Sequence, residues 1–249
     1  MKITVITIAY NAAETIEETI KSVISQDYKN LEYIIVDGAS KDNTLDIAHQ
    51  FNSQISKIVS EPDSGVYDAM NKGVGLATGD LIAILNADDT YAHPRVLSRV
   101  VEALVTSGAD SCYGDLIYVN RFQPGKTTRT WIAGPFRQEA FLDGWMPPHP
   151  SFFAKRKLYE NYGKFNTQLK TSADYELMLR FLFRYNATTI YINEVLVKMK
   201  VGGQSNASLK NRIKANQEDR LAWKINGLKP GNLTLIKKPF RKISQFWKR

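Results

Sequence analysis

The residues best placed to do chemistry are two adjacent carboxylates, Asp88 and Asp89, which follow the apolar run at residues 81–85. Five apolar residues bounded by turn formers predict a strand buried on both faces, as in a parallel sheet. Acids at its carboxyl end would lie in the crevice where open α/β sheets bind ligands. Paired carboxylates repel each other, and a hard divalent cation bridging to a phosphate relieves that repulsion. The alternative interpretation of an Asp-Asp pair is a solvated turn.

The elements that would position these acids alternate between strands and helices. Strands are predicted over residues 3–8, 31–36, 57–59, 81–85 and 111–119, with helices from about residues 12, 43, 66 and 94. Asn11 is expected to cap the first helix. The alternation indicates βαβ units, and therefore an α/β fold with a mainly parallel central sheet flanked by helices. The loops at Asp37 and at residues 86–89 would then face the same edge of the sheet.

The composition of the chain changes after about residue 120, where prolines, glycines and aromatic residues become frequent. A helix over residues 173–185 and strands over 188–192 and 195–199 follow, and then a basic amphipathic helix over 207–226. We therefore expect three regions, 1–120, 121–205 and 206–249. The boundary near 120 is a functional division, not necessarily one between independently folding units.

Composition sets further bounds on the protein. The chain has 249 residues, 43% of them hydrophobic, which suits one large α/β domain with or without a smaller appendage. Cys112 is the single cysteine, so there is no intrachain disulfide and a reducing cytoplasm fits. No apolar run approaches the ~18 residues of a transmembrane helix, and residues 3–8 resemble a first strand more than a signal peptide.

The net charge of +8 is unevenly distributed. Residues 237–249 combine six basic residues and no acid with aromatic residues at helical spacing. This pattern is typical of a helix that lies on an anionic membrane surface, and the alternative is a frayed, solvated tail. No nucleic-acid recognition motif accompanies the charge, so a nucleic-acid partner is not expected.

Four motifs in order give the sequence a family resemblance. They lie at residues 7–11, 36–44, 70–89 and 172–177, the last of which opens the helix at about residue 173. Together they resemble the family 2 glycosyltransferases, closely over roughly the first 110 residues and more thinly to about residue 205. The stretch at residues 60–73 is similar to a bacterial branch found in exopolysaccharide, colanic-acid-like and O-antigen pathways. The resemblance implies the GT-A fold, a Rossmann-like fold of nucleotide-diphospho-sugar transferases.

The resemblance also implies a donor site in region 1–120. Asp37 would accept a hydrogen bond from the nucleotide base, and Tyr10 and the backbone from Thr7 to Ala9 would line the base pocket. The alternative for Asp37 is an Asx turn, and both can hold at once. Asp88 would contact the ribose or the metal, Mg²⁺ or Mn²⁺, and Asp89 would bind the metal. The family's usual first acid is replaced here by Asn86, which leaves open how Asp88 and Asp89 divide these contacts.

Three further residues are weaker candidates for the site. Lys72, an arginine in many relatives, would pair with the diphosphate or with Asp88, or it is a solvated helix residue. Asp63 either approaches the donor sugar or serves turn chemistry alone. His149, in a proline-flanked loop, would touch phosphate or acceptor, although a lone histidine is more often structural. Residues 202–205 resemble the family's flexible late loop.

Region 121–205 would carry the catalytic base and the acceptor. Asp174 matches the family's base, but Ala173 stands where relatives often have a first acid, and the alternative for Asp174 is a charge that favours the helix N-terminus. Glu176 is the fallback base.

The function implied is inverting, metal-dependent transfer of a sugar, with a UDP-linked donor expected, to a saccharide or polyprenyl-linked acceptor. The enzyme would be cytoplasmic, and peripheral on the membrane if residues 237–249 bind it. Two alternatives stay open, namely nucleotidyl transfer and a non-catalytic nucleotide-sugar-binding module. The residues near Tyr10 lack the glycine-rich basic loop expected of the former, and Ala173 gives the latter limited support.

Overall fold

A computed structural model describes residues 1–121, 123, 125–201 and 209–231, with the backbone alone for 209–214. Within these residues the core is a nine-stranded sheet with the strand order β3-β2-β1-β4-β8-β6-β9-β5, and β7 also pairs with β6. The predicted late loop at 202–205 and the basic tail at 237–249 lie outside the described residues. No helix in the described part of the chain is long and apolar enough to cross a membrane.

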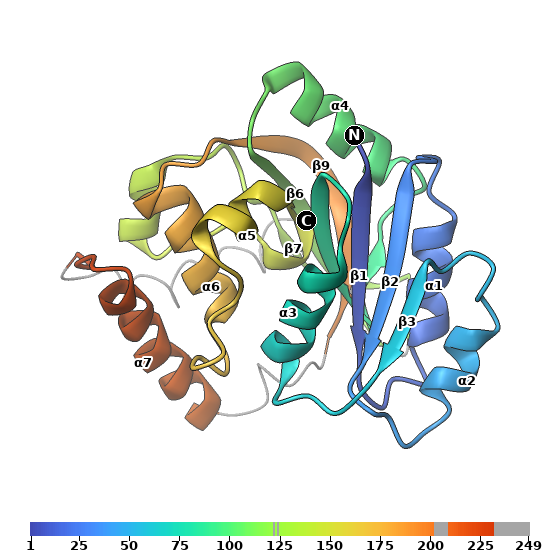
Figure 1. The fold of residues 1–249 in the computed structure, drawn as a ribbon. Helices are drawn as coiled ribbons and strands as arrows, with labels where there is room; N and C mark the ends of the chain where they lie inside the picture. The colour runs from blue at the N-terminus through green and yellow to red at the C-terminus, as the bar shows by residue number, and fades with distance from the viewer. Residues whose placement is uncertain (122, 124, 202–208, 232–249) are drawn as a thin grey trace.

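The first half of the sheet is entirely parallel. It contains β1 (Ile3–Ala9), β2 (Leu31–Asp37), β3 (Lys57–Ser60) and β4 (Leu81–Asn86), each within about one residue of its prediction. Most residues of β1, β2 and β4 are apolar and buried because helices cover both faces of the sheet, whereas β3 at the sheet edge is only partly buried. All four run downward in Figure 1, so their carboxyl ends share the lower edge.

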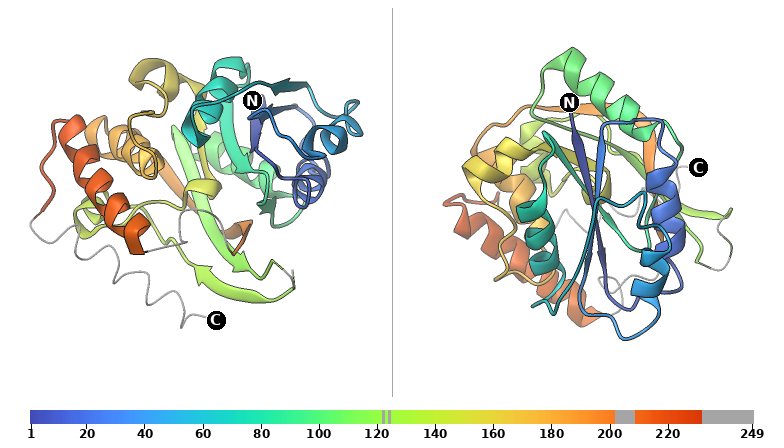
Figure 2. Two further views of the ribbon diagram at one scale, coloured as in Figure 1. Left: turned by 90° about the horizontal axis from the view of Figure 1, so that it is seen from below. Right: turned by 45° about the vertical axis from the view of Figure 1, so that its right-hand side comes forward.

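The helices form one layer on each face of the sheet (Figure 2). One core cluster packs α1 (Ile16–Ile24), α2 (Thr44–His49) and α4 (Val96–Ser107) onto the sheet. The other includes α3 (Val66–Leu76), α5 (Arg156–Tyr162), α6 (Ala173–Met178) and the π-helical turn η3 (Leu179–Arg184). The helix α7 (Leu209–Ile225) lies against α6 on the outside of this second layer.

The second half of the sheet is mixed and continues across residue 120. β8 (Phe152–Lys155) is antiparallel to both β4 and β6 (Ser111–Val119), and β9 (Thr189–Lys200) runs parallel to β6. β5 (Thr90–Tyr91) and β7 (Thr127–Trp131) are short antiparallel additions, and η1 (Gln138–Asp143) and η2 (His149–Ser151) are 3₁₀ turns. The predicted α/β class, with a largely parallel sheet flanked by helices, is confirmed.

The structure differs from the local predictions at four places. Asn11 does not cap α1, because its backbone is left-handed (φ 47°) and its side chain accepts a hydrogen bond from Lys41 N at 2.8 Å. The two strands predicted over 188–199 are one strand with a register shift opposite Asp115. The helix predicted over 173–185 changes to a π-helical turn at Leu179. β8 was missed because its four residues pair only with strands far away in the sequence.

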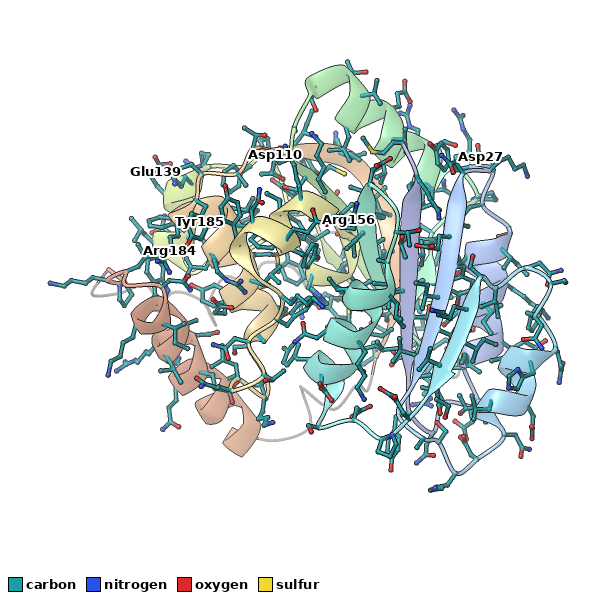
Figure 3. All side chains as sticks on the ribbon, in the orientation of Figure 1. Asp27, Asp110, Glu139, Arg156, Arg184 and Tyr185 are labelled. Atoms are coloured by element: carbon teal, nitrogen blue, oxygen red, sulfur yellow. The ribbon has the colours of Figure 1, made fainter. Side chains whose placement is uncertain are left out.

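Structural ion pairs and hydrogen bonds gather near the amino-terminal ends of the strands. Buried Glu32 accepts hydrogen bonds from Thr4 Oγ1 (2.5 Å), Thr78 N (2.8 Å) and Lys2 Nζ (3.1 Å). Arg156 donates to the carbonyl of Gly79 at 2.9 Å, and Figure 3 places it above α3, toward the upper edge of the sheet. The polar groups of Glu32 and Arg156 thus stabilise the fold at the amino-terminal edge of the sheet. We therefore look for a site at the carboxyl edge.

Candidate active site

The carboxyl ends of the first four strands bring the sequence-predicted residues to one edge. In the sheet register, Ala9 pairs with Asp37, Asp37 with Ser60, and Ile8 with Asn86. η2, which carries His149, precedes the antiparallel strand β8 and therefore also lies at the carboxyl end of β4. Residues from four separate stretches of the chain thus share one mouth of the sheet.

The acid pair is the most strained electrostatic feature of this edge. Asp89 is 1% exposed, and its Oδ2 accepts a hydrogen bond from Asn86 Nδ2 at 3.0 Å. Burial and the neighbouring charge of Asp88 raise the pKa of Asp89 well above its ordinary value. Burial also raises the pKa of Asp88, although the positive charges of Arg121 and Lys200 oppose that shift. A cation between these carboxylates would remove the cost of the charged state.

The residues present fit a divalent metal. Asp89 Oδ1 is a buried oxygen with no hydrogen-bond partner, which is the kind of atom a cation would satisfy. Among the described residues, no group of three histidine, cysteine, aspartate or glutamate side chains forms a complete metal cluster. Mg²⁺ and similar ions commonly take one or two carboxylates and complete their shell with phosphate oxygens and water. The pair at residues 88 and 89 would therefore hold a metal together with a phosphorylated ligand.

Tyr10, Gly38 and Asp63 lie close together at the ends of β1 and β2, and we call this group the Tyr10 shelf. Tyr10 is 62% exposed, unusual for a tyrosine at the end of a buried strand. Gly38 lies beneath it, where an added Cβ would be 3.3 Å from Tyr10 Cδ2 and 2.4 Å from Asp63 Oδ2. The absence of a side chain at residue 38 thus lets Tyr10 and Asp63 converge, and the contact of Asp63 with the donor sugar stays a prediction.

Asp37 organises the backbone under this shelf. It is fully buried, and its carboxylate accepts hydrogen bonds from Ser40 N (2.9 Å), Ser40 Oγ (2.5 Å) and Ser60 Oγ (2.7 Å). The backbone bond comes from the residue three positions on, so Asp37 braces the loop that follows β2 but does not form the predicted Asx turn, which closes onto the N–H two residues on. Its contact with a nucleotide base stays a prediction.

The structure argues against a ligand contact by Thr7 and against the Lys72–Asp88 pair, while a contact of Lys72 with the diphosphate stays a prediction. Thr7 is fully buried with its hydroxyl 3.0 Å from Tyr33 OH, and its backbone lies between two paired strands. Ala9, at the strand end, uses its carbonyl to accept from Gly38 N at 2.9 Å. Lys72 pairs with Glu61 at 3.0 Å and donates to the Pro62 carbonyl at 2.7 Å, so it holds the loop that carries Asp63 and is not paired with Asp88.

Asp174 is partly exposed in the first turn of α6, and it contacts Tyr67 in the first turn of α3. The Tyr67 hydroxyl donates to Asp174 Oδ1 at 3.1 Å, and the Tyr67 ring stacks on Phe165 with centroids 5.7 Å apart. Burial, and then the charge of Asp174, raise the pKa of Tyr67, so the tyrosine stays a donor. His149 contacts the same Phe165 ring edge-on at 6.0 Å. Burial lowers the pKa of His149 despite the charge of Asp174, which keeps the imidazole neutral.

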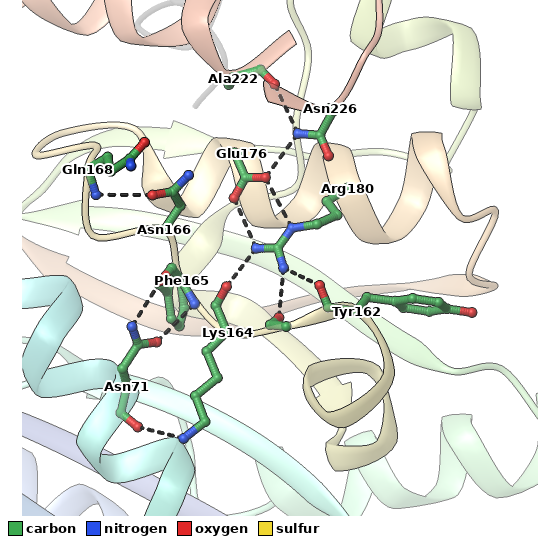
Figure 4. Close-up of polar contacts among 11 residues, drawn as sticks. Asn71, Tyr162, Lys164, Phe165, Asn166, Gln168, Glu176, Arg180, Ala222 and Asn226 are labelled. Carbon is green, nitrogen blue, oxygen red and sulfur yellow. Dashed lines mark hydrogen bonds and ion pairs between the residues drawn. The ribbon is translucent and has the colours of Figure 1, made fainter. Parts of the chain in front are cut away.

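Glu176 is a structural residue, and the fallback assignment as a base is wrong. It is 1% exposed, and both of its oxygens accept hydrogen bonds from Arg180, at 3.0 and 2.9 Å. Asn226 adds a third hydrogen bond at 2.9 Å (Figure 4). A carboxylate that is buried and paired in this way has no path to a substrate proton.

The same network sets the register between α6 and α3. Arg180 also donates to the carbonyls of residues 162–164, and the next residue, Phe165, exchanges two hydrogen bonds of 2.9 Å with the Asn71 side chain in α3 (Figure 4). The helix that carries Asp174 and the helix that carries Tyr67 are thereby fixed relative to each other. Sequence reasoning missed Tyr67 as a functional residue because nothing in its local sequence shows which carboxylate it meets.

A comparison with known protein families shows which family this chain belongs to. The model for "Glycosyl transferase family 2" matches residues 4–165, which include both the acid pair and the Tyr10 shelf. The chain belongs to glycosyl transferase family 2. A Mycobacterium bovis protein named "PGL/p-HBAD biosynthesis glycosyltransferase" is 31% identical to this family 2 glycosyltransferase over 201 residues, 79% of this chain and 76% of that one. An uncharacterized Mycobacterium tuberculosis glycosyltransferase is 34% identical over 181 residues, 72% of this chain and 68% of that one.

Solved structures support the fold of this family 2 glycosyltransferase. Staphylococcus aureus TarS in complex with UDP-GlcNAc superposes with a TM-score of 0.73 at 16% identity, covering 98% of this chain and 73% of that one. The mannosyltransferase PcManGT from Pyrobaculum calidifontis, in complex with GDP-Man and Mn²⁺, gives 0.69 at 21% identity, covering 96% of this chain and 69% of that one. The predicted GT-A fold is thus confirmed.

Proposed function

We propose that this enzyme transfers a sugar from a nucleotide diphosphate sugar to a hydroxyl group of a saccharide or lipid-linked saccharide, with inversion at the anomeric carbon. One observation supports the proposal most. Asp174, a partly exposed carboxylate oriented by Tyr67, lies at the same sheet edge as Asp88 and Asp89. That edge therefore combines a candidate base with a candidate phosphate and metal site.

The donor is proposed to bind across region 1–120. The base would stack on exposed Tyr10, and Asp37 and Asp63 would lie beneath it. A UDP-linked donor is the first choice, since TarS is seen with UDP-GlcNAc, while GDP-Man in PcManGT makes a GDP sugar the second. Asp88 and Asp89 would hold Mg²⁺ or Mn²⁺, which when bound neutralises charge on the leaving diphosphate.

Asp174 would accept the proton of the acceptor hydroxyl as that oxygen attacks the anomeric carbon from the face opposite the diphosphate. The bond from the anomeric carbon to the diphosphate oxygen breaks, and the nucleotide diphosphate leaves with the electron pair. General-base assistance of this kind contributes about 10²–10⁴-fold to the rate. One displacement inverts the anomeric configuration, so no nucleophilic side chain is needed.

The acceptor is proposed to lie against region 121–205, where Trp131, Phe136 and Trp145 are half-buried while Phe141, Phe152 and Phe153 are buried. The transfer is proposed to serve assembly of a bacterial cell-surface polysaccharide. The enzyme would then work at the inner face of the membrane, with residues 237–249 as its contact. Deleting these residues should reduce sedimentation with anionic vesicles and leave nucleotide binding unchanged, and undiminished sedimentation would remove the membrane contact.

The decisive experiment combines a donor panel with two variants. UDP-, GDP- and dTDP-sugars are incubated with the full chain and Mn²⁺, and slow hydrolysis identifies the donor. Asp89→Ala and Asp174→Ala should each abolish turnover, but only Asp89→Ala should weaken Mn²⁺-dependent nucleotide binding. Wild-type turnover by Asp174→Ala would overturn the base assignment. Binding without any turnover across the panel and acceptors would favour a non-catalytic binding module.

A further inference from the structure

The helix α7 is built into the region that carries Asp174. The indole N–H of Trp223, which is fully buried, donates to the Tyr175 hydroxyl at 2.8 Å. Asn226, just beyond the helix, donates to Glu176 at 2.9 Å. Tyr175 and Glu176 are the two residues directly after Asp174, so the α7 segment is hydrogen-bonded to the first turn of the helix that carries the candidate base.

Glu218 of α7 makes the most concentrated of these contacts. A single oxygen, Oε2, accepts hydrogen bonds from three consecutive backbone N–H groups, of Lys170 (3.0 Å), Thr171 (2.7 Å) and Ser172 (3.1 Å). It also accepts from Thr171 Oγ1 at 2.8 Å. Glu218 is 8% exposed, and hydrogen bonds to an ionised carboxylate are about twice as strong as neutral ones.

These bonds hold the backbone that leads into α6, because the three N–H groups belong to the N-cap residue Ser172 and the two residues before it. Ser172 occupies the N-cap position of α6 but makes no side-chain capping bond, and its hydroxyl donates instead to the Ala215 carbonyl of α7 at 3.3 Å. The N–H groups at a helix start need an acceptor, and a negative charge there is favourable. Glu218 supplies that charge from another helix, and it fixes the backbone two residues before Asp174.

We propose that Glu218 is a positioning residue for the candidate base Asp174. Its carboxylate gathers the N–H groups of residues 170–172 and so sets where the first turn of α6 places Asp174 relative to Tyr67. The inference rests on the proposed function, because Asp174 must be the base for its position to govern the rate. It gives α7 a role in turnover that is separate from donor binding.

The test compares Glu218→Ala and Glu218→Gln with Gln217→Ala, an exposed neighbour on the same helix. Turnover is measured with the donor that the panel identifies, affinity with UDP and Mn²⁺, and backbone protection by hydrogen exchange of peptides spanning residues 168–174. Glu218→Ala should lower kcat by on the order of 10–100-fold, since displacements of about 1 Å at a reacting group have effects of this size. UDP affinity should stay within about twofold, exchange should accelerate at 170–172, and Gln217→Ala should behave as wild type.

Glu218→Gln keeps the size and one acceptor oxygen, so it decides the matter if Glu218→Ala does not fold. It should lose at least about threefold in kcat with unchanged UDP affinity, because a neutral acceptor is roughly half as strong. A smaller loss, or parallel losses of kcat and UDP affinity, would overturn the positioning role. The two failures are distinguishable, since full activity in Asp174→Ala refutes the base itself, whereas full activity in Glu218→Gln refutes only Glu218.

Discussion

The Tyr67 hydroxyl lies 3.1 Å from Asp174 Oδ1, although 107 positions separate the two residues in the chain. The contact joins the first turns of α3 and α6, and the Arg180 network holds those helices in register (Figure 4). A carboxylate with one oxygen held by a donor keeps the other free for a substrate proton. The pair thus presents Asp174 in one orientation.

Replacing Tyr67 by phenylalanine removes this donor and keeps the ring that stacks on Phe165. A hydrogen bond to a charged group contributes about 1.5–3 kcal/mol, so we expect kcat to fall by on the order of tenfold or more. UDP affinity should not change, because the Tyr67 hydroxyl bonds to Asp174 and not to Asp88 or Asp89. Tyr159→Phe is the matched control, since Tyr159 packs on the same ring without contacting Asp174. Equal kinetics for the two variants would show that Tyr67 does not orient the base.

Asn86→Asp adds a third carboxylate beside Asp88 and Asp89 and tests the metal site. Asn86 now donates to Asp89 at 3.0 Å, and the substitution turns this attraction into repulsion among three carboxylates. Without metal, the melting temperature should fall by a few degrees, as roughly 1 kcal/mol does in domains of this size. Mn²⁺ should restore it and bind more tightly than to wild type. Asn30→Asp, which adds a charge at the opposite edge, should show no metal response, and the same response in both variants would argue against a site at 88–89.

Gly38→Ala probes the shelf formed by Tyr10 and Asp63. The new Cβ would approach Asp63 Oδ2 to 2.4 Å, and this flexible carboxylate has to move away. We expect the fold to survive and UDP affinity to drop several-fold in an isothermal titration. Gly125→Ala serves as the control, because an added Cβ there meets nothing within 4 Å. Unchanged UDP affinity in Gly38→Ala would place the nucleotide elsewhere.

The lowered pKa of Glu32 predicts how the free energy of unfolding depends on pH. Burial opposes its ionisation, but hydrogen bonds from Thr4, Thr78 and Lys2 outweigh burial and lower the pKa of Glu32 from 4.5 to about 2. A depressed pKa contributes stability that is complete above about pH 4.5 and is lost as the pH falls toward 2, with a size on the order of 3 kcal/mol. Glu32→Gln should therefore be less stable than wild type in urea at pH 6, with a gap that narrows at lower pH. Glu17→Gln, which breaks an exposed pair with Lys21, should show a gap near zero at every pH.

Local sequence determined the first half of this protein. The strands before Asp37 and before residues 86–89 are short apolar runs that end in turn residues, and a parallel sheet must bury such strands on both faces. Placing polar side chains at their shared edge needed no knowledge of distant contacts, because parallel strands end on the same side. The position of the acid pair follows from that local pattern, whereas the role of Tyr10 came from the family resemblance and its proximity to Asp63 only from the structure.

Only the tertiary structure decided what surrounds Asp174. The sequence could not reveal that Tyr67 donates to it, that Arg180 neutralises Glu176, or that Glu218 clamps residues 170–172 from 46 to 48 positions away. β8 likewise has a place only because β4 and β6 flank it. Such contacts depend on how helices and strands pack across long separations, and neither residue periodicity nor local propensity carries that information.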